Sequence, residues 1–441
     1  MLELKEKNEM ICDNLKRDES GELCLAGVPL SSLAREYGTP LYLYDEDKIR
    51  EKCRIYKRGT EKAFFGRAKV LYASKAASFT RLYSIMKEEG MGIDVVSVGE
   101  IYTAKRAGFP LGEAYFHSNN KTDLDISYAM DAGVGYFVVD NEEELFAIER
   151  EACERGIKQK VLLRLTPGID PHTYAQVATG KVDSKFGSAI ETGQAIAITE
   201  LAISLSHVDL FGFHCHVGSQ VFDSDVFIKS AEVMLDFVKE SKDRLGFVCR
   251  ELDLGGGFGV RYIKEQPTLD IEKAILEIAS FVTEYAKKLN IELPTIAFEP
   301  GRSIVADSGL TLYTVGTVKR IPGYKSYVSV DGGMTDNPRY ALYGAPYTIL
   351  PVSRDLPDST ETVSVVGRCC ESGDIIQEGV LLPSDIRRGE LLACLITGAY
   401  HYSMASNYNR IARPPVVMLS GGKSYVAVRR ETPEDVAGLD V

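Results

Sequence analysis

Short runs of β-branched and aromatic residues alternate with helical segments between residues 68 and 302. The helical segments 80–89, 142–154, 226–241 and 271–289 carry apolar residues three and four positions apart, which is the spacing of one helix face. Strands that alternate with helices in this number predict a (β/α)8 barrel. An open doubly wound sheet is the alternative, but it needs a topological switch point. The predicted strands are 69–74, 93–96, 114–117, 136–139, 161–165, 210–216, 251–254 and 295–298.

The chain changes character after Arg302. Pro, Gly, Asp and Asn turns then separate short β-branched or aromatic runs, which is typical of an all-β domain. An earlier segment, 23–40, has the pattern of a strand and a short helix that could join this domain. We therefore expect an N-terminal segment (1–45) packing with the β-domain, an α/β barrel (46–305) and a C-terminal β-barrel or sandwich (306–441). The predicted strands of the β-domain are 310–319, 327–330, 363–366, 391–395, 416–419 and 425–429.

Composition excludes several classes of protein. The 441 residues are 45% hydrophobic and 26% charged, as in an ordinary soluble protein, and the net charge of -12 disfavours nucleic-acid binding. No apolar run approaches the roughly 20 residues that span a bilayer, and residues 1–6 lack the order of a signal peptide. The nine cysteines are scattered, without a zinc pattern or a disulfide framework. We expect a cytoplasmic protein without membrane or nucleic-acid partners.

A lysine stands at the end of the first predicted barrel strand, in Tyr72-Ala73-Ser74-Lys75-Ala76. Burial there would lower the pKa of its ammonium group, and a neutral amine attacks carbonyls. Such an amine is a candidate Schiff-base nucleophile, most often for pyridoxal 5'-phosphate (PLP). Taken alone, a strand-end lysine paired with a carboxylate is the commoner case.

Barrel enzymes place function at the C-terminal ends of their strands. The candidates there are Lys75, Asp94, Asn119, Asn120, Arg164, His216, residues 255–257 and Glu299. Successive glycines in Gly255-Gly256-Gly257 can point several N–H groups at one anion, although a tight turn explains them equally well. The run is not a dinucleotide fingerprint, because position 260 is Val.

Glu299-Pro300-Gly301-Arg302 follows the eighth predicted strand. A salt bridge is one interpretation. The alternative is a carboxylate that keeps a pyridine nitrogen protonated, with Gly301 and Arg302 donating to a phosphate or a substrate carboxylate.

The sixth predicted strand carries His214 and His216 on one face and Cys215 on the other. No further His or Cys lies at zinc spacing, so we expect no metal. Two interpretations of this segment are open. Either the imidazole stacks on a cofactor ring while Ser219 bonds a phosphate, or the histidine is a core residue whose hydrogen bonds are satisfied within the protein.

Together these motifs resemble the fold-type III PLP-dependent amino acid decarboxylases, and most closely the branch that acts on diaminopimelate. The resemblance covers nearly the whole chain in order. It rests on residues 72–76, 214–220, 255–259, 299–302, 331–343, 370–374, 398–400 and 403–409. It implies a lyase that converts meso-2,6-diaminopimelate to L-lysine and CO2, the last step of lysine biosynthesis.

The resemblance also assigns a role to each matching residue. It implies that Lys75 carries PLP, that His216 stacks on the PLP ring, and that Cys370 donates a proton in the neighbouring site of a homodimer. The other implied cofactor contacts are Ser219, Gly256, Gly257, Glu299, Pro300, Gly301, Arg302 and Tyr400. The implied substrate contacts are Arg302, Arg339, Tyr343, Glu371 and Tyr400.

These residue types suit a substrate with a second ammonium and carboxylate. Arginines can bind the carboxylate and Glu371 the ammonium, and a thiol with a pKa of about 8.5 can protonate a carbanion near neutral pH. Cys369 adjoins Cys370, so both thiols are candidates for the acid. Pro338-Arg339-Tyr340 replaces the Arg-Pro order of many relatives.

Three other functions remain. A sister decarboxylase of ornithine, another basic amino acid or a carboxyalkyl-polyamine is the nearest, but a bare amine would leave two arginines unpaired. A racemase of the alanine type usually has arginine at the ring nitrogen, where this chain has Glu299. A catalytically inactive homologue would be expected to have lost Lys75 or Cys370.

Overall fold

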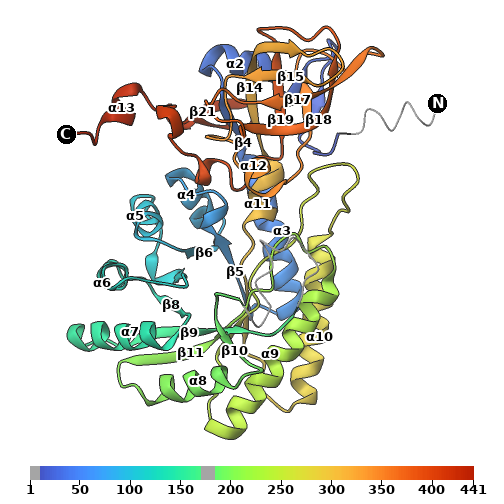
Figure 1. The fold of residues 1–441 in the computed structure, drawn as a ribbon. Helices are drawn as coiled ribbons and strands as arrows, with labels where there is room; N and C mark the ends of the chain where they lie inside the picture. The colour runs from blue at the N-terminus through green and yellow to red at the C-terminus, as the bar shows by residue number, and fades with distance from the viewer. Residues whose placement is uncertain (1–9, 170–183) are drawn as a thin grey trace. The chain divides into compact units, whose positions relative to one another are not determined.

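The computed structural model describes residues 10–169 and 184–441. The chain divides into two compact units, and Figure 1 labels their elements. The barrel unit comprises Lys52–Gly259 and Thr268–Ser303. The β unit comprises Met1–Glu51, Val260–Pro267 and Ile304–Val441.

The barrel unit is a closed sheet of parallel strands, which confirms the predicted (β/α)8 barrel and excludes the open sheet. The order is β5-β6-β7-β8-β9-β11-β12-β13, with β13 paired to β5. A short strand, β10 (Ser188–Ala189), adds to β9. The barrel strands are β5 (Ala68–Ala73), β6 (Gly92–Val95), β7 (Ala114–Phe116), β8 (Tyr136–Val139), β9 (Gln159–Thr166), β11 (Val208–His214), β12 (Glu251–Asp253) and β13 (Thr295–Phe298).

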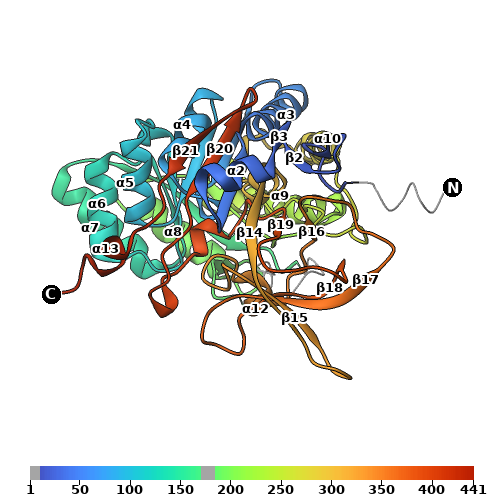
Figure 2. The same cartoon turned by 90° about the horizontal axis from the view of Figure 1, so that it is seen from above.

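Helices alternate with these strands, and α4 to α7 follow one another along the outside of the sheet (Figures 1 and 2). Local signals set their ends. Asn141 accepts a hydrogen bond from the Glu144 backbone at the start of α7, and Gly156 ends that helix in the left-handed conformation. The helices are α3 (Glu46–Phe64), α4 (Thr80–Glu88), α5 (Val98–Arg106), α6 (Asp123–Ala132), α7 (Glu142–Arg155), α8 (Gln194–Ser204), α9 (Ser224–Leu245) and α10 (Ile271–Lys288).

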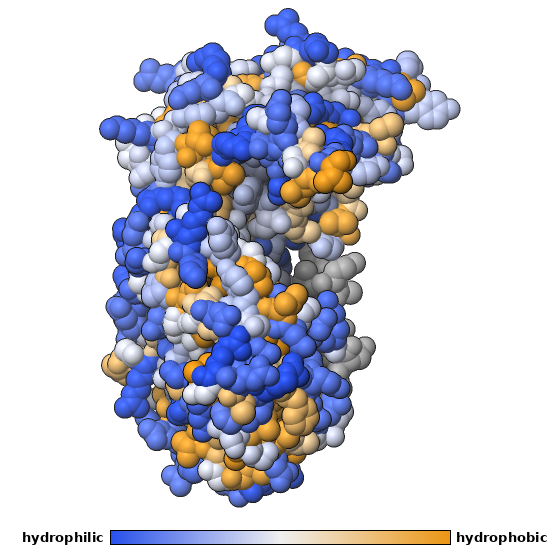
Figure 3. All heavy atoms as spheres, turned by 90° about the vertical axis from the view of Figure 1, so that its left-hand side faces the viewer, coloured by the Kyte–Doolittle hydropathy of each residue, from blue (hydrophilic) through white to orange (hydrophobic). Residues whose placement is uncertain are grey.

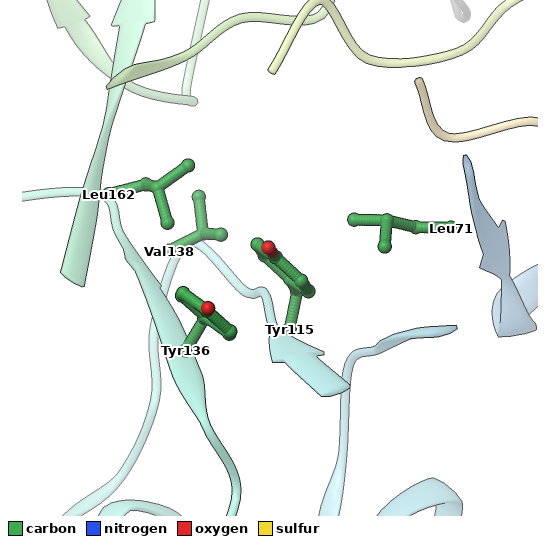
Figure 4. Close-up of a cluster of buried hydrophobic side chains, with 5 residues drawn as sticks. All are labelled: Leu71, Tyr115, Tyr136, Val138 and Leu162. Atoms are coloured by element: carbon green, nitrogen blue, oxygen red, sulfur yellow. The ribbon is translucent and has the colours of Figure 1, made fainter. Parts of the chain in front are cut away.

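Side chains fill the barrel near the N-terminal ends of its strands. The rings of Tyr115 and Tyr136 stack with centroids 4.3 Å apart, within a buried cluster that includes Leu71, Val138 and Leu162 (Figure 4). Lys69 Nζ donates to the Tyr115 hydroxyl at 2.7 Å and lies 2.8 Å from a Glu251 oxygen. Because this end is packed and its charges are paired, a ligand site belongs at the opposite, C-terminal end.

The β unit contains a sheet in the order β18-β17-β15-β14-β4-β20-β21, and β19 pairs with both β14 and β16. Its strand β4 comes from the N-terminal part of the chain and lies between β14 and β20. The strands are β4 (Leu41–Asp45), β14 (Gly309–Arg320), β15 (Ser326–Val330), β16 (Ile349–Pro351), β17 (Thr360–Val366), β18 (Ile375–Pro383), β19 (Leu391–Leu395), β20 (Val416–Ser420) and β21 (Lys423–Val428).

The remaining elements are short. A small sheet contains β1 (Leu15–Arg17), β2 (Leu23–Leu25) and β3 (Val28–Pro29), and α2 (Leu30–Tyr37) follows it. The last helices are α11 (Arg302–Val305), α12 (Arg339–Tyr343) and α13 (Pro433–Ala437).

The surface drawn in Figure 3 intersperses hydrophobic residues among hydrophilic ones. None of the helices formed by the described residues is both long enough and apolar enough to cross a membrane.

Candidate active site

Lys75 lies just beyond the C-terminal end of β5, in a 3-10 turn formed by Ser74–Ala76. Its neighbours Ser74 and Ala76 are buried, but Lys75 itself is exposed. The expectation of a buried lysine was therefore wrong. The strand ends at Ala73, one residue earlier than predicted, and the following turn carries the side chain out of the packed sheet.

Two carboxyl groups near Lys75 have raised pKa values. Burial raises the pKa of Asp94, at the end of β6, to about 6, against the opposing effects of His117 and Lys75. Burial likewise raises the pKa of Glu100, on α5, to about 7, although the Val96 backbone N–H donates to its carboxylate and the Lys75 charge lowers it. These groups can accept or release protons near neutral pH.

Glu299 follows β13 and is buried between two imidazoles. His214 Nε2 donates to Glu299 Oε2 at 3.1 Å, and His117 Nε2 lies 2.7 Å from Oε1. Burial opposes ionisation, but the two imidazoles outweigh it and hold the pKa of Glu299 well below its usual range. Glu299 is therefore an anion in a dry environment.

Asp253, at the end of β12, is the protonated partner of this anion. It is fully buried, and its Oδ1 accepts the Gly255 backbone N–H at 2.8 Å. Burial and the neighbouring Glu299 charge raise the pKa of Asp253 well above its usual range. Of these two adjacent carboxyl groups, Glu299 thus carries the negative charge.

His216 is neutral. Burial and the nearby charges of Lys75 and Arg164 hold its pKa well below the usual value. Its Nδ1 accepts the Gly256 backbone N–H at 3.3 Å, which assigns the ring proton to Nε2. A neutral imidazole of fixed orientation can stack on an aromatic ring without adding charge.

The glycine run is required by close approaches of neighbouring backbone. A Cβ at Gly256 would lie 2.0 Å from the Glu299 carbonyl oxygen, and one at Gly257 would lie 2.1 Å from the Gly218 carbonyl oxygen. Gly257 also has a φ of 114°, which disfavours other residues. The loop therefore lies directly against the loops that carry Glu299 and Ser219.

Arg302 and Ser219 form the polar contact beside this loop. The buried guanidinium donates from Nε and Nη2 to Ser219 Oγ, at 3.1 and 2.9 Å. Gly301 precedes the arginine, and a Cβ there would come within 2.9 Å of Ala73. The predicted cofactor contacts that follow β5, β11, β12 and β13 thus lie in loops that touch one another.

The predicted substrate contacts of the β unit form a second group. Arg339 begins α12, and its guanidinium lies 5.3 Å from the ring centre of Tyr343 and 5.1 Å from that of Tyr400. Its Nε donates to the Tyr347 hydroxyl at 3.0 Å, and both residues are buried. Tyr400 has a φ of 64°, a conformation unusual for tyrosine.

The two candidate acids differ in environment. Cys370 is exposed, and its backbone N–H donates to Asn409 Oδ1 at 2.8 Å. Burial and the Asp374 carboxylate raise the pKa of the Cys369 thiol to about 11. Glu371, next in the chain, is exposed and accepts hydrogen bonds from Ser372 and Gly373 of its own loop. Cys370 is therefore the more exposed thiol of the pair.

Sequence reasoning missed three groups at the barrel mouth, namely His117, Glu100 and Asp253. His117 ends the run that predicted β7, so its position at a strand end was a signal that could have identified it. Among the described residues, His117, His214 and Glu299 also bring metal-type ligand atoms within 4.8 Å of one another.

These residues fit PLP by their chemistry. Lys75 offers an amine at a strand end, His216 a neutral ring, and Glu299 an anion for a pyridinium nitrogen. Backbone N–H groups of a glycine loop and a buried arginine beside Ser219 suit a phosphate.

Comparison with known proteins agrees with this reading. Residues 46–306 match the family model described as the pyridoxal binding domain of pyridoxal-dependent decarboxylases. The diaminopimelate decarboxylase of Bacillus subtilis is 44% identical over 97% of both chains. The crystal structure of M. jannaschii diaminopimelate decarboxylase with L-lysine has a TM-score of 0.88 and 33% identity, over 98% of this chain and 99% of that one. The Helicobacter pylori enzyme, also complexed with L-lysine, has a TM-score of 0.84 and 32% identity, over 93% and 99%.

Fold and site together define a PLP-dependent decarboxylase built on a (β/α)8 barrel with an additional β-domain. Within that class, full-length similarity at this level shows that the chain belongs to the diaminopimelate decarboxylase family.

Proposed function

We propose that the chain binds PLP at the C-terminal end of its barrel and decarboxylates meso-2,6-diaminopimelate to L-lysine, the last step of lysine biosynthesis. The observation that carries this proposal is an anionic Glu299 at the end of β13, the strand that pairs with the β5 strand of Lys75. An amine and a buried anion on adjacent strand ends suit the aldehyde and the ring nitrogen of one cofactor.

Bound PLP supplies an electron sink that stabilises the carbanion left after loss of CO2. The chain's own residues prepare that chemistry. Glu299 would hold a proton on the ring nitrogen, His216 would cover one face of the ring, and Lys75 would bind the aldehyde. Ser219, Gly256, Gly257, Pro300, Gly301 and Arg302 hold the phosphate side, and we assign Tyr400 to the cofactor as well.

Substrate selection is assigned to charged groups that match the far end of diaminopimelate. Arg302 and Arg339 bind its carboxylate, Glu371 binds its ammonium, and Tyr343 and Tyr400 pack against it. Arg339 supports this role, because Tyr347 and two aromatic rings fix its guanidinium. An exposed, flexible cation would lose more conformational entropy on binding.

We further propose a homodimer in which Cys370 protonates the carbanion in the neighbouring subunit's site. The exposure of Cys370 supports this role. Mixing inactive Lys75→Ala with inactive Cys370→Ala subunits is expected to restore part of the activity through hybrid dimers. No recovery despite demonstrated subunit exchange would contradict the shared site.

The decisive test is CO2 release from diaminopimelate, ornithine, lysine and a carboxyalkyl-polyamine by the PLP-loaded protein. Diaminopimelate is expected to be the preferred substrate by a wide margin. A preference for ornithine would refute the roles of Arg339 and Glu371 and favour the sister decarboxylase.

The attachment site has its own test. The loaded protein is expected to absorb at about 420 nm, and borohydride trapping followed by peptide mapping should place the cofactor on Lys75. Lys75→Arg, which keeps the charge, is the matched variant and should lose both the band and the adduct.

A further inference from the structure

Two imidazoles flank Glu299, and no role in the proposed function accounts for both. His117 comes from the end of β7 and His214 from the end of β11, and their rings meet edge to face with centroids 4.9 Å apart. Each ring presents its Nε2 to a different oxygen of the carboxylate, at 2.7 and 3.1 Å. All three side chains are buried.

The proton positions follow from this geometry. Burial lowers the pKa of His214, so its ring is neutral and carries one N–H. That proton lies on Nε2, because Nε2 faces Glu299 while Nδ1 has no hydrogen-bond partner among the described residues. His117 presents the corresponding nitrogen to the other oxygen. Glu299 thus faces a ring nitrogen on each side.

We propose that His117 and His214 are positioning residues that hold Glu299 as an oriented anion for the cofactor's ring nitrogen, an inference that rests on the proposed PLP site. Few other groups near the two imidazoles can stabilise the Glu299 anion. Asp94 and Asp253 are buried carboxyl groups that would repel the Glu299 charge if ionised. Lys75 and Arg164 contribute positive charge from further strand ends.

A metal ion could also use these ligands, but the distances favour direct contact between the imidazoles and the carboxylate. Ligand atoms around a tetrahedral zinc, each about 2.1 Å from the metal, lie about 3.4 Å apart. The contact between His117 and Glu299 is 2.7 Å, shorter than that spacing. The two atoms are therefore closer together than ligands of one tetrahedral zinc.

The mechanism predicts a loss in chemistry rather than in binding. Without the imidazole beside one oxygen, buried Glu299 gains affinity for a proton and withdraws it from the ring nitrogen. His117→Phe should therefore lower kcat by about tenfold or more, the factor expected for losing one close polar contact with a charged group. The KM for diaminopimelate should stay within about twofold, because uniform binding is unchanged.

The direct measurement is the 15N resonance of ring-labelled PLP in the holoenzyme. Wild type should show a protonated nitrogen, and both His117→Phe and Glu299→Gln should shift the resonance toward the unprotonated form. His117→Gln places an amide N–H where Nε2 was and should restore the wild-type resonance. His117→Asn is too short to do so, and it replaces the phenylalanine variant if that variant does not fold.

A matched control is available on the barrel surface. His207 also bonds a glutamate, with Nδ1 2.9 Å from Glu149 Oε1, but it is only partly buried. His207→Phe should leave the resonance and kcat unchanged. An unshifted resonance in both His117→Phe and His117→Asn would overturn the inference, as would stoichiometric zinc binding to the wild-type apoenzyme that His117→Phe abolishes.

The proposed function can be refuted independently of the role of the two imidazoles. If wild type neither forms the cofactor band nor releases CO2, the PLP site itself is wrong. If wild type does both and His117→Phe keeps the protonated resonance, only the role of the imidazole pair is wrong.

Discussion

Replacing Ser219 by Ala tests how the barrel holds the phosphate. Both acceptor positions of Ser219 Oγ are directed at Arg302, which donates to it from Nε at 3.1 Å and from Nη2 at 2.9 Å. A hydroxyl has two acceptor lone pairs and one proton. Because the arginine uses the lone pairs, the proton is the part of Ser219 that can donate to a ligand. We expect that ligand to be a phosphate oxygen.

The size of the effect follows from the charges involved. The substitution removes one hydrogen bond to an anion and takes the Ser219 acceptor away from a buried guanidinium. Hydrogen bonds to charged groups contribute about 1.5–3 kcal/mol. The Kd of PLP for the apoenzyme should therefore rise between about tenfold and about 150-fold. Changes in kcat at saturating PLP should be small, because Ser219 does not touch the reacting carbon.

The assay is a titration of apoenzyme with PLP, followed by cofactor absorbance or protein fluorescence. Ser219→Thr keeps the hydroxyl and should retain tight binding. Ser230→Ala is the control, since Ser230 is a buried serine of the barrel unit whose Oγ lies 3.4 Å from Cys215 Sγ. A rise in Kd below about threefold, or an equal rise in Ser230→Ala, would refute this account of Ser219.

Three further predictions concern packing, pH and thiol chemistry. Gly256→Ala should lower both thermal stability and PLP affinity, because its Cβ would lie 2.0 Å from the Glu299 carbonyl oxygen. The control is Gly112→Ala, which should melt like wild type because a Cβ at Gly112 meets nothing within 4 Å. The apoenzyme's free energy of unfolding should fall as pH rises from about 4 to about 7, because between the unfolded and the raised folded pKa values of Asp94 and Glu100 the folded state binds more protons than the unfolded chain. Glu299 has the opposite sign, because its lowered pKa contributes stability that is lost only as pH falls below its unfolded value. Asp94→Asn with Glu100→Gln should therefore flatten the decline in urea titrations. Alkylation at pH 8 should label Cys370 and largely spare Cys369, whose pKa is raised to about 11 by burial and Asp374, with peptide mass spectrometry as the measurement.

The barrel could be predicted from the sequence because its strands are short, apolar and regularly spaced. The predicted runs 136–139 and 295–298 coincide with β8 and β13, and the other strand ends differ by a few residues. β18 was missed for a physical reason. It contains Gln377, Glu378 and Gly379, and Gly379 has a φ of 70°, so the strand is irregular and its alternation is broken.

The environment of the site could be predicted less well than its residues. The exposure of Lys75 depends on a 3-10 turn that no periodicity reveals. The contact of His117 with Glu299 joins β7 to β13, strands that are separated by β5 and β6 in the sheet. Sequence places both residues at strand ends, but only closure of the barrel determines which side chains meet across its mouth.

Electrostatic differences among neighbouring carboxyl groups explain how this mouth can serve one cofactor. Asp94, Asp253 and Glu299 are all buried, and burial by itself would favour the protonated form of each. Only Glu299 faces a ring nitrogen on both of its oxygens, and only its pKa is lowered, whereas the pKa values of Asp94 and Asp253 are raised by burial and by the Glu299 charge. Of the three carboxyl groups, Glu299 therefore stays ionised over the widest pH range, and it lies at the position proposed for the ring nitrogen. A second anion beside it would compete for the same proton and weaken the electron sink, so the neutrality of Asp253 is as necessary to the proposed chemistry as the charge of Glu299.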